Sequence, residues 1–190
     1  MAGNAPKTAG ILALQGDFEA HKKAIERAGG HAIEVRTLAD LAQCDGLIIP
    51  GGESTTMLKL LDQEGLTDAI RSFSEQKPVY GSCAGAILLA REVTHPTQPS
   101  LALMDIAVER NAYGRQIDSR IVRIPMPEGG DLEAVFIRAP IIRRLGAGSS
   151  VLARYDGDPV WVEHGRNMVT TFHPELTADL RVHRRFLEKL

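Results

Sequence analysis

One cysteine of the chain lies in a sequence context that could make it a nucleophile. The segment 81–85 reads Gly-Ser-Cys-Ala-Gly and stands between a predicted strand and a predicted helix. This is the setting of a nucleophile elbow, a tight turn that leaves no room for side chains beside the nucleophile. A thiol at the start of a helix, here Cys83, also experiences positive potential from unpaired N–H groups, which favours the thiolate. Most free cysteines are simply buried, and Cys44, which has no such glycines around it, is expected to be one of them.

A cysteine nucleophile requires a base and a group that orients the base, and the late segment TTFHPELT contains both residue types. His173 and Glu175 are two residues apart, and residues with this spacing in an extended segment project to the same side. Pro174 favours extended geometry in the residue before it. An ordinary surface pair is the alternative interpretation. His21 and His183 fall on predicted helices and are weaker candidates for the base.

A glycine pair follows another buried strand, in the segment IIPGGEST. Gly51 and Gly52 allow backbone N–H groups to face a cleft with no side chain in the way. With the N–H of Ala84, which follows Cys83, this loop could stabilise an oxyanion or hold a substrate carboxylate. An ordinary turn between a strand and a helix is the alternative. A phosphate-binding loop is excluded, because no Lys-Ser or Lys-Thr follows at the required spacing.

Alternating strands and helices in the first half of the chain must position these residues. Short apolar segments predict strands at 10–14, 31–36, 44–52 and 77–83. The helices between them are expected to be capped by Asp17 and by Ser54 or Thr55. Short continuous apolar strands separated by helices indicate a parallel sheet that is covered on both faces.

The second half of the chain is richer in strands. Strand-like segments with turn residues between them occupy 101–116, 120–126, 132–140 and 149–175, the last as three strands. A final helix is predicted from about 177 to 190. Because no repeat or linker interrupts the sequence, we expect residues 1–190 to form a single domain. The expected fold class is α/β and flavodoxin-like, with a three-layer, open, mostly parallel sheet, helices on both faces and an antiparallel C-terminal addition.

Composition limits the possible partners and settings. The 190 residues include 22 basic and 24 acidic side chains, a formal net charge of −2, whereas nucleic acid or an anionic membrane would favour a basic patch. No apolar stretch approaches the roughly 20 residues of a membrane span, and the N-terminus lacks the apolar core of a secretory signal. The two cysteines make no disulfide framework, so a cytoplasmic location is expected. No metal site is expected, because close ligand spacings are missing.

The combination of these segments resembles the class I, triad-type glutamine amidotransferase family. Within that family the resemblance is closest to the glutaminase subunits of pyridoxal 5′-phosphate synthase. The stretches that carry it run almost from end to end, and they are LALQGDFEAH (12–21), PGGEST (50–55), GSCAGAI (81–87), RNAYGRQ (110–116), FIRAP (136–140) and FHPELT (172–177). The segments LALQG (12–16), RNAYGRQ and FIRAP are the more specific signals, and they indicate the subfamily.

The resemblance implies hydrolysis of L-glutamine to glutamate and ammonia. Cys83 would attack the side-chain amide to form a thioester, His173 would act as general base and then acid, and Glu175 would orient His173. The residues that match the glutamine-binding positions of the family are Gly51, Gly52, Glu53, Arg110, Ile137 and Arg138. No cofactor is implied. Ammonia would pass to a separate synthase (lyase) subunit in a hetero-oligomer, with no nucleic acid or membrane involved.

Three alternatives remain at this point. A class I glutaminase that serves a different synthase would share the same three residues and differ in its partner. A non-catalytic regulatory subunit of the same fold would not require all three. A hydrolase or peptidase with a cysteine elbow would act on esters or peptides, and it would not need the RNAYGRQ and FIRAP stretches.

Overall fold

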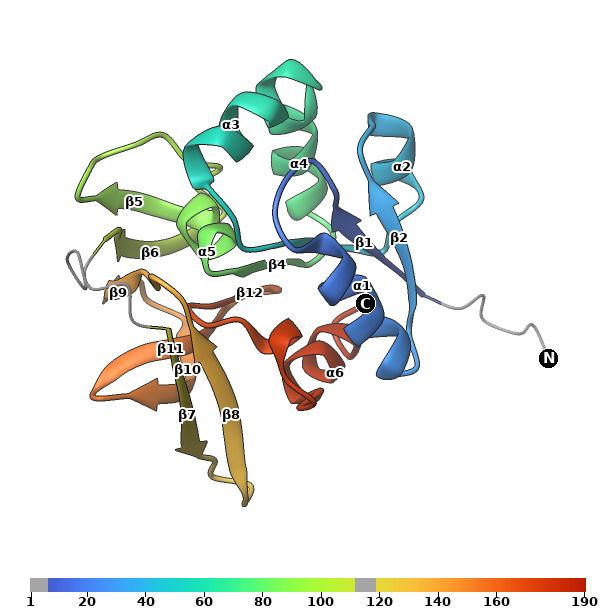
Figure 1. Cartoon of the computed structure of the whole chain (residues 1–190). Coiled ribbons are helices and arrows are strands. Elements are labelled where there is room, and N and C mark those ends of the chain that lie inside the picture. Colours follow the sequence, from blue (N-terminus) through green and yellow to red (C-terminus); the bar gives the residue numbers. More distant parts are fainter. Residues whose placement is uncertain (1–6, 112–118) are drawn as a thin grey trace.

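A seven-stranded sheet forms the centre of the molecule (Figure 1). The computed structural model describes residues 7–111 and 119–190. The strand order is β10-β11-β12-β4-β3-β1-β2. In chain order the strands of this sheet are β1 (Thr8–Leu12), β2 (His31–Val35), β3 (Gly46–Ile49), β4 (Val79–Ser82), β10 (Ser149–Tyr155), β11 (Asp158–His164) and β12 (Asn167–Thr170). Strands β2, β1, β3, β4 and β12 pair in parallel, whereas β11 and β10 continue the sheet in antiparallel pairs.

Helices cover both faces of this sheet, because its central strands are apolar on both sides. In β3, Leu47 and Ile49 join one buried cluster and Ile48 joins the other, as expected when successive side chains project to opposite faces. The first cluster lies under α2 to α5, and the second lies under α1 and α6. The helices are α1 (Phe18–Arg27), α2 (Leu38–Ala42), α3 (Ser54–Gln63), α4 (Leu66–Ser74), α5 (Ala84–Leu89), the 3-10 helix η1 (Pro174–Leu176) and α6 (Arg181–Leu187).

Two smaller sheets extend the fold beside the carboxyl ends of the central strands (Figure 1). One has the order β5-β6-β9 and the other pairs β7 with β8. Their strands are β5 (Ala90–Thr94), β6 (Met104–Glu109), β7 (Arg120–Pro125), β8 (Asp131–Phe136) and β9 (Ile141–Leu145). The expected α/β fold with a mostly parallel sheet and antiparallel additions is therefore confirmed.

Three local expectations were wrong. The cap of α3 is the side chain of Glu53, which accepts hydrogen bonds from the N–H groups of Thr55 and Thr56, so neither Ser54 nor Thr55 is the cap. Asp17 occupies the cap position of α1, but its side chain makes no capping hydrogen bond.

The last helix also begins later than expected. The segment before it forms η1, whose Thr177 hydroxyl donates to the Pro174 carbonyl oxygen. Asp179 then accepts a hydrogen bond from the backbone N–H of Arg181, which is the first residue of α6. These local bonds satisfy backbone groups that an earlier helix start would have used. Within residues 7–111 and 119–190, no helix combines the length and apolar character that crossing a membrane requires.

Candidate active site

The carboxyl ends of β3, β4 and β12 lie at one edge of the sheet, and each leads into a segment expected to carry chemistry. Strand β4 lies between β3 and β12, and all three run in the same direction. Gly51 follows β3, Cys83 follows β4, and His173 follows β12. The N–H of Cys83 donates to the carbonyl oxygen of Thr170 at 2.8 Å, which ties the end of β4 to the end of β12. Topology therefore brings residues that are distant in the sequence to one site.

Cys83 occupies a strained turn between β4 and α5. Its backbone angles are φ 49° and ψ −105°, and residues other than glycine rarely adopt such positive φ. The flanking glycines are required by close backbone approach. A Cβ on Gly81 would lie 2.5 Å from the carbonyl group of Gly85, and a Cβ on Gly85 would collide with the backbone oxygen of Ile49. The elbow is therefore held by contacts that no side chain at either position could tolerate.

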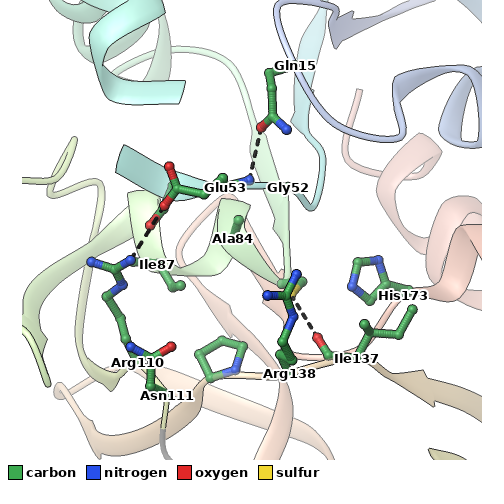
Figure 2. A pocket seen from close by; sticks show the side chains of 13 residues that line it. Gln15, Gly52, Glu53, Ala84, Ile87, Arg110, Asn111, Ile137, Arg138 and His173 are labelled. Atoms are coloured by element: carbon green, nitrogen blue, oxygen red, sulfur yellow. Dashed lines mark hydrogen bonds and ion pairs between the residues drawn. The ribbon is translucent and has the colours of Figure 1, made fainter. Parts of the chain in front are cut away.

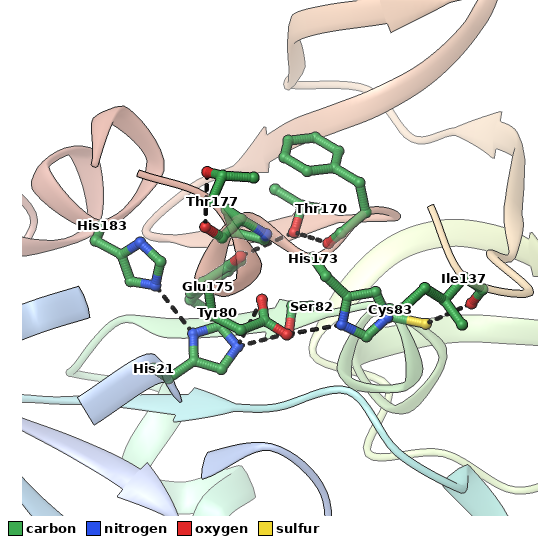
Figure 3. Close-up of polar contacts among 12 residues, drawn as sticks. His21, Tyr80, Ser82, Cys83, Ile137, Thr170, His173, Glu175, Thr177 and His183 are labelled. Atoms are coloured by element: carbon green, nitrogen blue, oxygen red, sulfur yellow. Dashed lines mark hydrogen bonds and ion pairs between the residues drawn. The ribbon is translucent and has the colours of Figure 1, made fainter. Parts of the chain in front are cut away.

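His173 and Glu175 form a buried pair beside the elbow (Figure 3). His173 Nδ1 lies 2.7 Å from Glu175 Oε1, so Nδ1–H donates to the carboxylate and Nε2 stays available on the other side of the ring. The backbone N–H of His173 donates to the carbonyl oxygen of Val135 at 2.8 Å, which anchors the segment to β8. The imidazole therefore has a fixed tautomer and a fixed orientation.

Proton affinities at this pair depend on burial and on the partners together. Burial disfavours the charged imidazole, but hydrogen bonds to Cys83 and Glu175 outweigh it and raise the pKa of His173 to about 10. Burial likewise disfavours the Glu175 carboxylate, yet the nearby His21 and the hydrogen bond from His173 hold the pKa of Glu175 below its ordinary value. Glu175 is therefore ionised and His173 is ready to carry a proton at neutral pH.

The glycine pair after β3 packs directly against this group. A Cβ on Gly51 would collide with the His173 ring, and Gly52 has a φ of 154° that favours glycine. A Cβ on Gly52 would collide with the side chain of Gln15, whose oxygen accepts a hydrogen bond from the N–H of Glu53 at 2.9 Å. Close approach to the imidazole on one side and to Gln15 on the other thus requires both glycines.

A cavity of about 380 Å³ has Cys83 among its lining residues. Figure 2 shows this cavity from close by. Its walls come from the loops after β1, β3, β4, β6 and β8, together with His173. The lining residues are Gln15, Gly52, Glu53, Ser54, Cys83, Ala84, Ile87, Arg110, Asn111, Ile137, Arg138, Pro140 and His173. Cys83 Sγ lies 3.9 Å from the carbonyl oxygen of Ile137. Volume and lining suit a small polar molecule with its reactive end at the thiol.

Negatively and positively charged side chains both line the cavity. Glu53 accepts hydrogen bonds from the hydroxyl and backbone N–H groups of Thr55 and Thr56, and these bonds lower the pKa of Glu53 to about 2. Arg110 Nη2 lies 3.6 Å from Glu53 Oε1, and Arg138, which also lines the cavity, has a φ of 45°. A carboxylate and two guanidinium groups are complementary to the ammonium and carboxylate groups of an amino acid.

Most residues singled out from the sequence meet at this cavity. Cys83, Ala84 and His173 line it, as do five of the six positions expected to bind glutamine. Gly51 lies behind the surface against His173, and Glu175 lies behind the ring. Residues 112–116 of the stretch RNAYGRQ lie outside the described residues.

Sequence reasoning assigned no role to Gln15, Asn111 or Pro140, which also line the cavity. Gln15 had a recognisable signal. It follows a predicted strand directly, and loops at the carboxyl ends of parallel strands form the ligand crevice in open α/β sheets.

The two histidines set aside as helical residues form a chain that leads to Glu175, in which His21 lies next to Glu175 and His183 lies next to His21 (Figure 3). His21 on α1 and His183 on α6 are fully buried, with His21 Nδ1 3.0 Å from His183 Nε2. His21 Nε2 lies 3.3 Å from Glu175 Oε2 and 2.9 Å from Ser82 Oγ. No sequence spacing indicates this arrangement, because the residues come from four separate elements.

Comparison with known proteins identifies the family of the chain. The model of the SNO glutamine amidotransferase family matches residues 11–190. The chain belongs to this family. A curated relative from Solibacter usitatus, named pyridoxal 5′-phosphate synthase subunit PdxT, is 59% identical over 97% of this chain and 100% of its own length. A relative of the same name from a strain of Thermus thermophilus is 51% identical over 94% of this chain and 95% of its own.

Solved structures show the same fold. One described as a glutamine amidotransferase is 48% identical and superimposes with a TM-score of 0.89, covering 95% of this chain and 97% of the other. A structure of PurLQS from Thermotoga maritima, 17% identical with a TM-score of 0.67, covers 97% of this chain and 94% of its own, and shows likeness of fold alone.

Proposed function

We propose that this chain is the glutaminase subunit of a pyridoxal 5′-phosphate synthase. The observation that carries the proposal is the strained Cys83 elbow beside the buried pair of His173 and Glu175, at the base of a cavity with charged groups of both signs. Membership of a glutamine amidotransferase family supports the reaction, and the names of the relatives support the pathway, vitamin B6 biosynthesis. The whole chain, residues 1–190, acts in this proposal as one glutaminase domain.

The first half of the reaction forms a thioester. The Cys83 thiolate attacks the side-chain amide carbon of L-glutamine, and the amide oxygen becomes an oxyanion. N–H groups of Ala84 and of the loop at Gly51 and Gly52 stabilise that oxyanion. The carbon–nitrogen bond then breaks as the His173 imidazolium gives its proton to the leaving nitrogen, which departs as ammonia.

The second half releases glutamate. His173, now neutral, takes a proton from water, and the resulting hydroxide attacks the thioester carbonyl carbon. The carbon–sulfur bond breaks, the thiolate of Cys83 is restored, and His173 is again an imidazolium. Glu175 holds Nδ1 protonated throughout, so that Nε2 does all the proton transfer.

Binding residues hold the amino acid end of the substrate in this scheme. Arg110 and Arg138 bind the α-carboxylate and Glu53 binds the α-ammonium, while Ile137 packs beside the chain at the thiol. Ammonia passes to the synthase (lyase) subunit in a hetero-oligomer. The two free thiols, Cys44 and Cys83, support a cytoplasmic setting.

Release of ammonia from L-glutamine tests the proposal, measured with and without the synthase subunit of the same organism. Cys83→Ala is expected to abolish release in both conditions. The matched control is Cys44→Ala, because Cys44 is also a buried free thiol but lies just before β3, and burial raises its pKa to about 11. Activity that survives Cys83→Ala contradicts the chemistry. Activity that ignores the synthase subunit contradicts the partner alone.

A further inference from the structure

Two buried histidines lie in sequence behind the proposed catalytic carboxylate: His21 contacts Glu175, and His183 contacts His21. His21 and His183 have no exposed surface, and they come from α1 and α6, on the face of the sheet that also buries Tyr80. Glu175 Oε1 accepts the hydrogen bond of His173, whereas Glu175 Oε2 is buried, accepts no hydrogen bond among the described residues, and has His21 Nε2 at 3.3 Å as its ion-pair neighbour. An ionised carboxylate oxygen without a donor is costly in such a site.

With both imidazole rings neutral, only one placement of their protons lets His21 donate a hydrogen bond to Glu175. If His21 carried its proton on Nδ1, its bare Nε2 would face Glu175 Oε2 with two lone pairs opposed. His183 would then carry its own proton on Nδ1, which is buried and has no described partner. The reverse placement leaves only the lone pair of His183 Nδ1 without a described partner, which costs less than a buried N–H or two opposed lone pairs. His183 Nε2–H donates to His21 Nδ1, and His21 Nε2–H is shared between Ser82 Oγ and Glu175 Oε2.

We propose that His21 and His183 are positioning residues for the glutaminase reaction, in which His183 fixes the tautomer of His21 and His21 donates a neutral hydrogen bond to Glu175. The proposal rests on the proposed function for its effect on turnover. Glu175 is then held from both oxygens, by His173 in front and His21 behind. A fixed, ionised carboxylate keeps His173 Nδ1 protonated and its ring aimed at Cys83.

A neutral donor has an advantage over a cation at this place. Burial lowers the pKa of His21, outweighing the effect of Glu175 and Asp17, which raise it, and His173 adds to the lowering. Burial also lowers the pKa of His183 to about 3, with His21 and Arg27 acting in the same direction and Glu175 in the opposite one. Both rings are therefore neutral at pH 7. They stabilise the carboxylate without competing with His173 for the reaction's proton.

Paired substitutions of equal size test the proposal. His21→Leu and His183→Leu remove the donors, whereas His21→Gln and His183→Gln place an amide near the position of each Nε2. Val182→Ala is the matched control, because Val182 precedes His183 on α6, is fully buried and has an apolar side chain. Steady-state glutaminase kinetics would be measured on the complex with the synthase subunit between about pH 5 and 10, a range that spans the ordinary pKa of histidine, together with melting temperatures.

We expect His21→Leu to lower kcat at least tenfold with KM changed less than twofold, and to move the acid limb of the kcat profile to higher pH. A smaller loss of kcat is expected for His183→Leu, and each glutamine variant should restore most of the lost kcat. Val182→Ala should lower the melting temperature and leave both limbs in place. If His21→Leu fails to fold, the two variants His183→Leu and His183→Gln test the proposal by the same criteria.

Two results would overturn the proposal. One is a leucine variant that loses thermal stability as Val182→Ala does but keeps kcat and the pH profile. The other is a glutamine variant as impaired as its leucine counterpart. A second assay separates these results from failure of the proposed function. This assay follows the alkylation of Cys83 by iodoacetamide in the isolated chain, using peptide mass, as a function of pH. The pH at which alkylation is half-maximal should be higher in His21→Leu than in the unmodified chain, whatever the substrate is. An unchanged midpoint counts against the proposal.

Discussion

Replacing Glu175 by glutamine tests how the carboxylate supports the imidazole. The side chain keeps its shape and loses its charge, and the contact at stake is the 2.7 Å hydrogen bond between His173 Nδ1 and Glu175 Oε1. A hydrogen bond to a charged group contributes about 1.5–3 kcal/mol. The cationic form of His173 loses that contribution, so a smaller fraction of the enzyme holds the reactive pair of Cys83 thiolate and His173 imidazolium. The rate of thioester formation should therefore fall about 10- to 100-fold, since about 1.36 kcal/mol is a factor of ten.

The pH profile of this variant has a defined sign. The negative charge of Glu175 helps to raise the pKa of His173 to about 10. Without that charge the imidazolium loses its proton at lower pH, so the alkaline limb of kcat/KM should move downward. Single-turnover release of ammonia by the complex, recorded from neutral pH up to that pKa of about 10, measures both the rate and the limb.

Two further variants delimit the result. His173→Asn removes proton transfer itself and is expected to cost more, about 10²- to 10⁴-fold. Glu163→Gln is the matched control, because Glu163 is buried and accepts hydrogen bonds from Arg185 at 2.8 and 3.0 Å, outside the cavity. The reasoning is refuted if Glu175→Gln reduces the rate more than His173→Asn, or if its rate and alkaline limb match those of Glu163→Gln.

Three other predictions concern stability and binding. Gly85→Ala should lower the free energy of unfolding by about 1–3 kcal/mol in urea titrations, because the added Cβ collides with the backbone of β3. An unchanged urea midpoint would show that the elbow is loosely packed. Glu53→Ala should remove the cap of α3, costing about 1 kcal/mol, and should raise KM for glutamine without lowering kcat in proportion; a change in kcat alone would contradict the binding role. His183 has a folded pKa of about 3, below its ordinary value of 6.5, so the unfolded chain binds more protons and stability should fall as the pH drops from about 6.5 toward 3. His183→Leu should flatten that slope in urea titrations, and an unchanged slope would assign the acid lability to other groups.

Sequence patterns predicted the central sheet well, because alternation of short apolar strands with helices reflects burial on both faces. They were weaker where two elements follow each other without a turn. Strand β5 begins at Ala90, directly after the last residue of α5, so apolar periodicity does not mark its start. Strand β9 was not expected either, and it begins at Ile141, just after the segment of residues 132–140 that was predicted as one strand.

Candidate site residues could be predicted where their chemistry lies within a few positions of one another. The elbow around Cys83 and the pair of His173 and Glu175 are of this kind. The capping role of Glu53 was not foreseen, because a long side chain reached two N–H groups usually capped by a shorter residue. His21 and His183 are 162 positions apart, and only the packing of α1 and α6 over one face of the sheet brings them together.

The central claim is that Cys83 forms a covalent thioester with the substrate. Its most direct test is peptide mass spectrometry of the complex, quenched in acid during turnover of L-glutamine. A glutamyl group is expected on the peptide that contains Cys83, absent from Cys83→Ala and enriched in His173→Asn if that variant forms the thioester faster than it hydrolyses it. The peptide that contains Cys44 should stay unmodified. Turnover with no adduct on Cys83 at any quench time, or an adduct on Cys44 instead, would contradict the account.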